Sequence, residues 1–329
     1  MSGRKLLIYY AWSRPAEISA PLEIIENRFP TLFESRRMLY PRFEELSDPA
    51  RFNQGVAGFL DHIMKQNFAA FVDFASRETG SPVAEIERVT DDERLTPLDA
   101  ARLENVDTLV VISFDALRSG QEASTAEIEA VREFLAKPDN VAFICPHHDI
   151  GEAPGLDHDA RVRRQEADFL HHGDKTIPPQ QGFGGFARTL LVGLGVPVEN
   201  RFGLRPAAEP DGSPTPIAVD HKLDRLRLLD GVKTFNLHPH LPQLERIGDA
   251  ASRLDVIARQ KIDLSAPPHP FTSKGRDELD ALLQSRPDVF AGALLVGDAT
   301  LWSSTAGGVE SLRHLWANVV SRTAVTAPE

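Results

Sequence analysis

The stretch from Thr108 to Phe114 reads TLVVISF, and it predicts a buried β-strand. Its apolar side chains do not alternate with polar ones, as expected for a strand that is covered on both faces. Related runs predict further strands over Lys5–Ala11 (KLLIYYA), Asn140–Cys145 (NVAFIC), Val232–Leu237 and Ala291–Val296 (AGALLV), with an edge strand over Val83–Val89.

Helical patterns separate these runs. The segment Ser124-Thr125-Ala126-Glu127 predicts a helix start, because its serine hydroxyl and glutamate carboxylate form a capping box for two backbone amides. Further helices are predicted over Ile18–Ile25, from Ser47 to Gly80, near Ala160–Leu170, and over Gly182–Leu194, Arg276–Leu283 and Gly308–Ser321. Strands that alternate with helices indicate an α/β protein, with a parallel sheet and helices on both faces.

The composition excludes several classes of protein. The 329 residues carry 36 Lys and Arg against 48 Asp and Glu, a formal charge of −12, which disfavours nucleic acid and acidic membrane surfaces as partners. The apolar runs are far too short to cross a bilayer, and one cysteine permits no internal disulfide. The first residues lead straight into a strand without a small-residue cleavage site, so we expect no signal peptide and a cytoplasmic protein.

The eleven histidines are the feature to follow, since histidine titrates near neutral pH and is the commonest metal ligand. In parallel sheets, ligands bind at the carboxyl ends of the strands. The residues that directly follow a predicted strand are Trp12 to Arg14, Asp115, Cys145 to Asp149, His238 to His240, and Gly297 with Asp298. The sequence therefore predicts a pocket among these residues.

Two segments resemble class I glutamine amidotransferase-like domains. Glu127–Asp149 is similar to the helix, strand and sharp turn of these domains, where the turn commonly reads Gly-Ile-Cys-x-Gly-His-Gln. Leu294–Trp302 and the helix to Ser321 resemble the end of divergent members that are not amidotransferases, and Leu229–Val232 resembles a short segment of the same relatives. The resemblance implies one flavodoxin-like α/β domain over residues 1–329, elaborated by N-terminal helices and by an insertion or lid over about 151–181.

The chain departs from the amidotransferase pattern in ways that concern catalysis. Phe143 and His147 are large where a nucleophile elbow needs small residues, and Pro146 has no amide hydrogen to stabilise an oxyanion. Asp298 stands where the amidotransferases carry their catalytic histidine. We therefore expect a divergent member of the superfamily that is not a true glutamine amidotransferase.

The catalytic candidates surround the predicted strand end at Cys145. Cys145 is either a nucleophile or a small apolar core residue. His147, His148 and Asp149 form a dense polar cluster in which a histidine is a candidate general base or metal ligand and Asp149 its orienting group or a turn cap. Asp298 completes the catalytic candidates.

The pattern His238-Pro239-His240 is a candidate metal-binding pair, because an extended chain places both rings on one side. Together with His148, this pair would suit a divalent metal, Zn or Fe. Gly182–Phe186 lacks the Lys and Ser or Thr of a P-loop, so no nucleotide cofactor is expected. His171 and His172 belong to a lid or to a solvated loop.

Trp12, Arg14 and Asp115 are candidate substrate-binding residues, because an aromatic ring and an arginine could hold an aromatic or carboxylate-bearing ligand. The lead hypothesis is a small-molecule hydrolase that activates water with a histidine base or a bound metal, at a C–N or related bond. The alternatives are a hydrolase with Cys145 as nucleophile and no metal, and a non-catalytic sensor or interaction domain. The expected partner is a small-molecule substrate, with no nucleic acid and no membrane, and a homo-oligomer is left open.

Overall fold

The computed structural model describes residues 3–18, 65–115, 120–147, 184–238, 240–265 and 271–322. Within these ranges an eight-stranded sheet has the order β2-β1-β3-β4-β10-β9-β8-β6. Its first five strands pair in parallel, and they are β2 (Ala84–Val89), β1 (Leu6–Ser13), β3 (Thr108–Ser113), β4 (Val141–Pro146) and β10 (Ala293–Gly297). This is the strand order of flavodoxin-like sheets, so the predicted fold class is confirmed.

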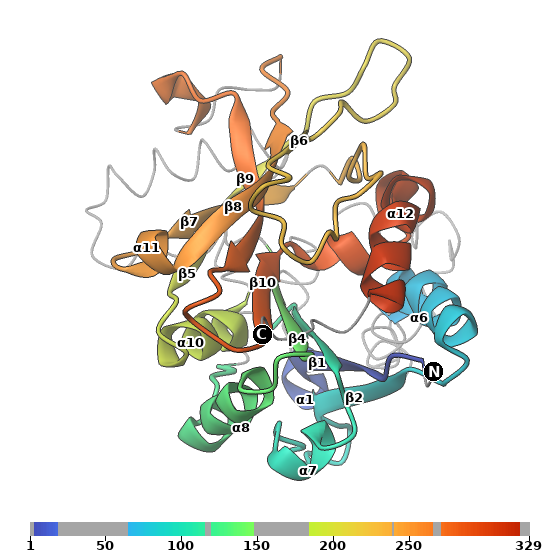
Figure 1. The fold of residues 1–329 in the computed structure, drawn as a ribbon, viewed down its shortest axis with the longest axis vertical. Helices are drawn as coiled ribbons and strands as arrows, with labels where there is room; N and C mark the ends of the chain where they lie inside the picture. Colours follow the sequence, from blue (N-terminus) through green and yellow to red (C-terminus); the bar gives the residue numbers. More distant parts are fainter. Residues whose placement is uncertain are drawn as a thin grey trace, which may run out of the picture.

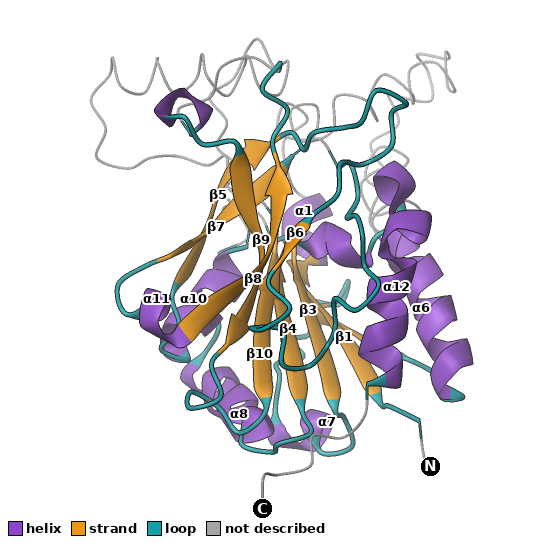
Figure 2. Cartoon of the chain, turned by 45° about the horizontal axis from the view of Figure 1, so that its top comes forward, coloured by secondary structure: helices purple, strands orange, loops and turns teal. Residues whose placement is uncertain are grey.

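Three antiparallel strands extend this sheet beyond β10. They are β9 (Glu278–Ser285), β8 (Leu254–Lys261) and the short β6 (Ala218–Val219). Two other strands, β5 (Val198–Leu204) and β7 (Leu241–Arg246), form a second, antiparallel sheet. Figure 2 shows the parallel strands fanned side by side, with β5 and β7 next to the antiparallel strands.

Helices cover both faces of the parallel strands (Figures 1 and 2). On one face lie α6 (Lys65–Thr79) and α12 (Gly308–Ser321), side by side. On the other lie α7 (Ala100–Leu103), α8 (Thr125–Leu135) and α10 (Gly185–Gly193). The shorter elements are α1 (Arg14–Ile18), α11 (Ala250–Arg253) and the 3-10 turns η3 (Thr272–Lys274), η4 (Ala299–Trp302) and η5 (Thr305–Gly307).

Two hydrophobic cores lie on the two faces of the sheet, and β1 contributes to both. Ile8 and Tyr10 enter the core beneath α6 and α12, whereas Leu7 and Tyr9 enter the core beneath α8 and α10. Successive side chains of a strand point to opposite faces, so an uninterrupted apolar run fills both cores.

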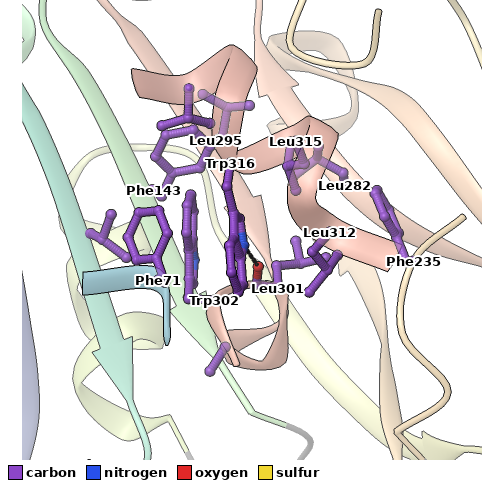
Figure 3. Close-up of a cluster of buried hydrophobic side chains, with 14 of the residues drawn as sticks. Phe71, Phe143, Phe235, Leu282, Leu295, Leu301, Trp302, Leu312, Leu315 and Trp316 are labelled. Atoms are coloured by element: carbon purple, nitrogen blue, oxygen red, sulfur yellow. Dashed lines mark hydrogen bonds between the residues drawn. The ribbon is translucent and has the colours of Figure 1, made fainter. Parts of the chain in front are cut away.

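The first core is built around two tryptophans (Figure 3). The ring of Trp302 lies 4.7 Å from that of Phe71 and 4.8 Å from that of Phe143, between centroids. Trp316 also packs on Phe71, at 5.4 Å, and its indole N–H donates to the carbonyl of Leu301. These contacts fasten α6, α12 and η4 to the sheet, directly beyond the end of β10.

Several predicted elements are confirmed. The capping box is present, with the Ser124 hydroxyl accepting from the Glu127 amide and the Glu127 carboxylate accepting from the Ser124 amide. The closing helix spans Gly308–Ser321, and the described part of the helix predicted to end at Gly80 spans Lys65–Thr79.

Two predicted elements are wrong. Glu278–Ser285 forms the strand β9, although Arg276–Leu283 was expected to be helical. Its leucines and alanine favour helix by propensity, but pairing between β8 and β10 overrides that preference. Val232–Leu237 belongs to no strand, and its apolar character reflects a loop whose Val232 and Phe235 are buried in the first core.

The N-terminal helices predicted before Lys65 and the insertion predicted over 151–181 fall outside the described residues, apart from α1. Across the described ranges, no helix combines the length and the apolar character that crossing a membrane requires.

Candidate functional site

His147 and Asp298 meet at the carboxyl edge of the parallel sheet. β4 and β10 are neighbours in parallel register, with Ile144 opposite Val296, so the residues that follow both strands emerge together. The imidazole Nδ1 of His147 lies 3.0 Å from the carboxylate Oδ2 of Asp298. Both residues are 5% exposed, and in such a poorly hydrated setting a charge-assisted hydrogen bond is strong.

Asp298 is held by the turn that it starts. Its Oδ1 accepts from the Thr300 amide over 2.8 Å and from the Thr300 hydroxyl, so it caps η4. Burial acts to raise the pKa of Asp298, but His147, His238 and the Thr300 hydroxyl outweigh burial and leave the pKa below its ordinary value. The carboxylate is therefore ionised at neutral pH.

His147 is fixed by groups from the end of β3 and from β5. The ring of Phe114, just after β3, stacks on its imidazole at 4.6 Å between centroids. Its backbone amide donates to the Ser113 carbonyl over 3.3 Å, and its carbonyl accepts from the side-chain amide of Asn200 on β5. Asn200 in turn accepts from Arg188 of α10 over 2.8 Å. Asn200 escaped the sequence analysis because β5 carried no recognisable strand pattern.

His238 lies against His147. Their rings are nearly perpendicular, at 77°, with 5.1 Å between centroids, and the ring of His240 follows 5.8 Å from that of His238. Removal from water, and then the neighbouring His147, lower the pKa of His238 to about 4. The fold thus brings together the two histidine motifs that the sequence placed after strands, and His147 makes the contact.

Asn236 joins the two halves of this site. Its Oδ1 accepts from the His238 amide over 3.1 Å, and its Nδ2 donates to the Thr300 carbonyl over 2.8 Å. Asn236 is buried, and its own carbonyl accepts from Gln260. It therefore fixes the His238 segment relative to the turn that holds Asp298, a role for which the sequence carried no signal.

The predicted metal ligands are only partly within the structure. His238 and His240 are described, whereas His148 lies outside the described residues. Among the residues that can be described, no group of three or more His, Cys, Asp or Glu side chains is arranged to hold a metal ion. A site for Zn or Fe that includes His148 stays a prediction.

Cys145 is a fully buried member of the first core. The indole N–H of Trp302 donates to its Sγ over 3.1 Å, and burial raises the pKa of the thiol far above its ordinary value. A nucleophilic cysteine needs thiolate character and access. Of the two interpretations that the sequence left open, these contacts support the core residue.

Trp12 and Arg14 both bind Glu87 of β2. The Trp12 indole donates to its Oε2 over 3.1 Å, and the Arg14 guanidinium donates to both carboxylate oxygens. Lys65 of α6 adds a third cation at 3.0 Å. Burial opposes ionisation of Glu87, but these donors bring its pKa to about 2. This partly buried cluster joins β1, β2 and α6, and a role in substrate binding stays a prediction.

Asp115 occupies the start of α10. Its carboxylate accepts from the Ser113 hydroxyl and, over 3.0 Å, from the Phe186 amide. Burial raises the pKa of Asp115 to about 7, although these donors and Arg188 act in the opposite direction. The contacts show a buried helix cap, and the predicted role of Asp115 in substrate binding stays a prediction.

Asp115→Asn is expected to remove a pH dependence of stability. The folded pKa, about 7, lies above the ordinary value of 3.8, so the folded chain keeps a proton that the unfolded chain releases. This group's contribution is therefore full below about pH 4 and falls by roughly 1.4 kcal/mol per pH unit up to about pH 7. Urea unfolding at pH 4.5 and 7 measures it: Asp115→Asn should gain stability relative to wild type at the higher pH. The exposed Asp139→Asn is the control, and an equal gain there contradicts the assignment.

His148, Asp149, His171 and His172 lie outside the described residues. No protein-family model and no curated protein matches this chain. The resemblance to glutamine amidotransferase-like domains therefore stays a prediction, and the site must be interpreted from its own geometry.

Proposed function

We propose that this chain is a small-molecule hydrolase in which His147, oriented by Asp298, is the general base that activates water. The hydrogen bond between His147 Nδ1 and Asp298 Oδ2, at the carboxyl edge of a parallel sheet, is the observation that carries the proposal. A buried carboxylate that accepts from one imidazole nitrogen fixes the tautomer and the orientation of the ring, as general-base histidines require.

The chemistry follows from that hydrogen bond, in which an ionised Asp298 can only accept, so that Nδ1 of His147 is the donor. With its Nδ1 proton donated to the ionised Asp298, neutral His147 has its lone pair on Nε2. Nε2 takes a proton from water as the water oxygen bonds to the substrate carbon, and the π electrons of the carbonyl move to its oxygen. When the intermediate collapses, the bond to the leaving nitrogen or oxygen breaks, and the proton on Nε2 passes to the leaving atom.

The surroundings of Cys145 favour water over the thiol as the nucleophile. Cys145 is fully buried in the first core, and the indole N–H of Trp302 donates to its sulfur. Cys145→Ala should therefore keep the hydrolytic activity, whereas loss of activity would support the thiol mechanism. Dialysis against a chelator tests the remaining alternative, in which a bound metal activates the water. In that case the dialysed protein would be inactive until Zn or Fe is added.

The experiment is a hydrolysis screen of the purified chain against amides, esters and phosphate esters of small organic acids and alcohols. His147→Gln, prepared in parallel, identifies activities that belong to the site, because contaminating enzymes persist in that preparation. The exposed His314→Gln controls for histidine substitution as such. If wild type hydrolyses no compound beyond the His147→Gln background, the proposal fails and a non-catalytic domain is favoured.

A further inference from the structure

The neighbouring His238 has a hydrogen bond of the opposite kind from that of His147. The backbone amide of His240 approaches the Nδ1 of His238 at 3.3 Å. A backbone N–H can only donate, so this Nδ1 must be the acceptor and carries no proton. The proton of the neutral ring is then on Nε2, the nitrogen farther from the backbone.

The two rings therefore present complementary groups. His147 donates from Nδ1 to Asp298, which leaves a basic lone pair on Nε2, whereas His238 accepts at Nδ1 and carries a donor on Nε2. Their ring centroids are 5.1 Å apart. Two rings this close can both contact one small functional group.

We propose that His238 is a second catalytic residue, a neutral imidazole whose Nε2–H donates to the substrate carbonyl oxygen as that oxygen becomes negatively charged. This inference rests on the proposed function, in which His147 activates the attacking water. Water activation by His147 does not explain which group stabilises the negative charge on the oxygen of the tetrahedral intermediate, and His238 would do so. A neutral histidine that polarises a carbonyl is an established catalytic device in other folds.

The same geometry specifies the substrate class. The ionised Asp298 is hydrogen-bonded to His147, so an anionic reacting group would meet a carboxylate near the base. A neutral imidazole donor adds no positive charge that would offset this repulsion. The reacting group is therefore an uncharged acyl group, an amide or an ester, and not a phosphate ester.

The position of the donor is fixed independently of any ligand. Asn236 accepts from the His238 amide and donates to the carbonyl of Thr300, the residue that clamps Asp298. Asn236 thus links the segment that carries His238 to the turn that holds Asp298, the partner of His147. Preorganised charge stabilisation requires such a fixed arrangement.

The first test measures the tautomer of His238 directly in the full-length protein. Long-range ¹H–¹⁵N correlation spectra at pH 7.5 report which ring nitrogen is protonated, with His238→Gln used to assign the resonances. We expect a non-protonated Nδ1 and a protonated Nε2. A protonated Nδ1 overturns the proposal, because the outer nitrogen would then be a base or a metal ligand.

The second test compares two substitutions on an acyl substrate found in the screen. His238→Phe keeps a ring but has no N–H, and it should lower kcat by about a hundredfold or more with little change in KM. His238→Gln supplies a side-chain N–H near the position of Nε2, so its kcat should be at least ten times that of His238→Phe. Circular dichroism and unfolding curves of both variants exclude loss of the fold as the cause.

The outcomes separate the two proposals. Hydrolysis that depends on His147 but is equal in His238→Phe and wild type overturns the donor role and leaves the hydrolase intact. Equal losses in His238→Phe and His238→Gln, or activity that a chelator abolishes, also overturn the donor role. Hydrolysis of phosphate esters alone overturns the substrate class. Absence of any hydrolysis overturns both proposals.

Discussion

Asp298→Asn is expected to lower kcat by about a thousandfold or more, with KM nearly unchanged, on any acyl substrate that the chain hydrolyses. The shape and volume of the side chain are preserved, so the loss reports the chemistry of the pair. The effect is expected on kcat because the carboxylate stabilises the imidazolium that forms only as water is deprotonated.

The turn that holds Asp298 determines how an asparagine would be oriented. Oδ1 of Asp298 accepts from the amide and the hydroxyl of Thr300, and this position requires an acceptor. The asparagine carbonyl would occupy it, so the side-chain N–H₂ would face Nδ1 of His147. A donor there forces the proton of neutral His147 onto Nε2, so that this nitrogen has no lone pair with which to accept a proton from water.

The matched control is Asp224→Asn. Asp224 is another buried aspartate, and its carboxylate accepts from the backbone amides of Leu228 and Leu229. Steady-state kinetics of both variants, with unfolding curves, separate catalysis from stability. If Asp298→Asn lowers kcat no more than Asp224→Asn does, His147 is not the base.

The inner strands of the parallel half could be predicted because they are buried on both faces. TLVVISF and NVAFIC are apolar at successive positions, and only a strand between two layers of helices needs that pattern. The antiparallel half lacked such a signal. β7 (LPQLER) contains a proline and polar residues, and β9 (ELDALLQS) is composed largely of helix formers, so their structure depends on neighbouring strands far along the chain.

The site could be predicted as a set of residues but not as a set of contacts. His147 and Asp298 follow strands that were predicted correctly, and the rule for ligands in parallel sheets singled them out. His238 was singled out by a predicted strand that the structure does not contain. The supporting residues could not be found in this way. Asn200 acts on the carbonyl of His147 and Asn236 on that of Thr300, and such contacts exist only once distant segments are folded together.

Glu127→Ala is expected to lower the free energy of unfolding by about 3–5 kcal/mol, the range for removing one partner of a buried ion pair. Glu127 is fully buried, and its Oε2 lies 2.9 Å from a guanidinium nitrogen of Arg88 on β2. The same carboxylate accepts from Ser124 in the capping box and from the Tyr9 hydroxyl. Alanine would remove all these acceptors and leave the charge of Arg88 buried.

Urea unfolding measures the loss, and Glu129→Ala on the same helix is the matched control. Glu129 pairs with Arg132 at the surface, where its side chain is 56% exposed, so its removal should cost less than about 1 kcal/mol.

A second comparison isolates the buried charge. The double variant Arg88→Met with Glu127→Ala should lose less free energy of unfolding than the sum of the losses in the two single variants. Because both substitutions lie on the same helix, a loss in Glu127→Ala no larger than that in Glu129→Ala would show that the pair does not stabilise this face of the sheet. A strictly additive double variant would show that Glu127 does not act as the counter-ion that makes a buried arginine tolerable.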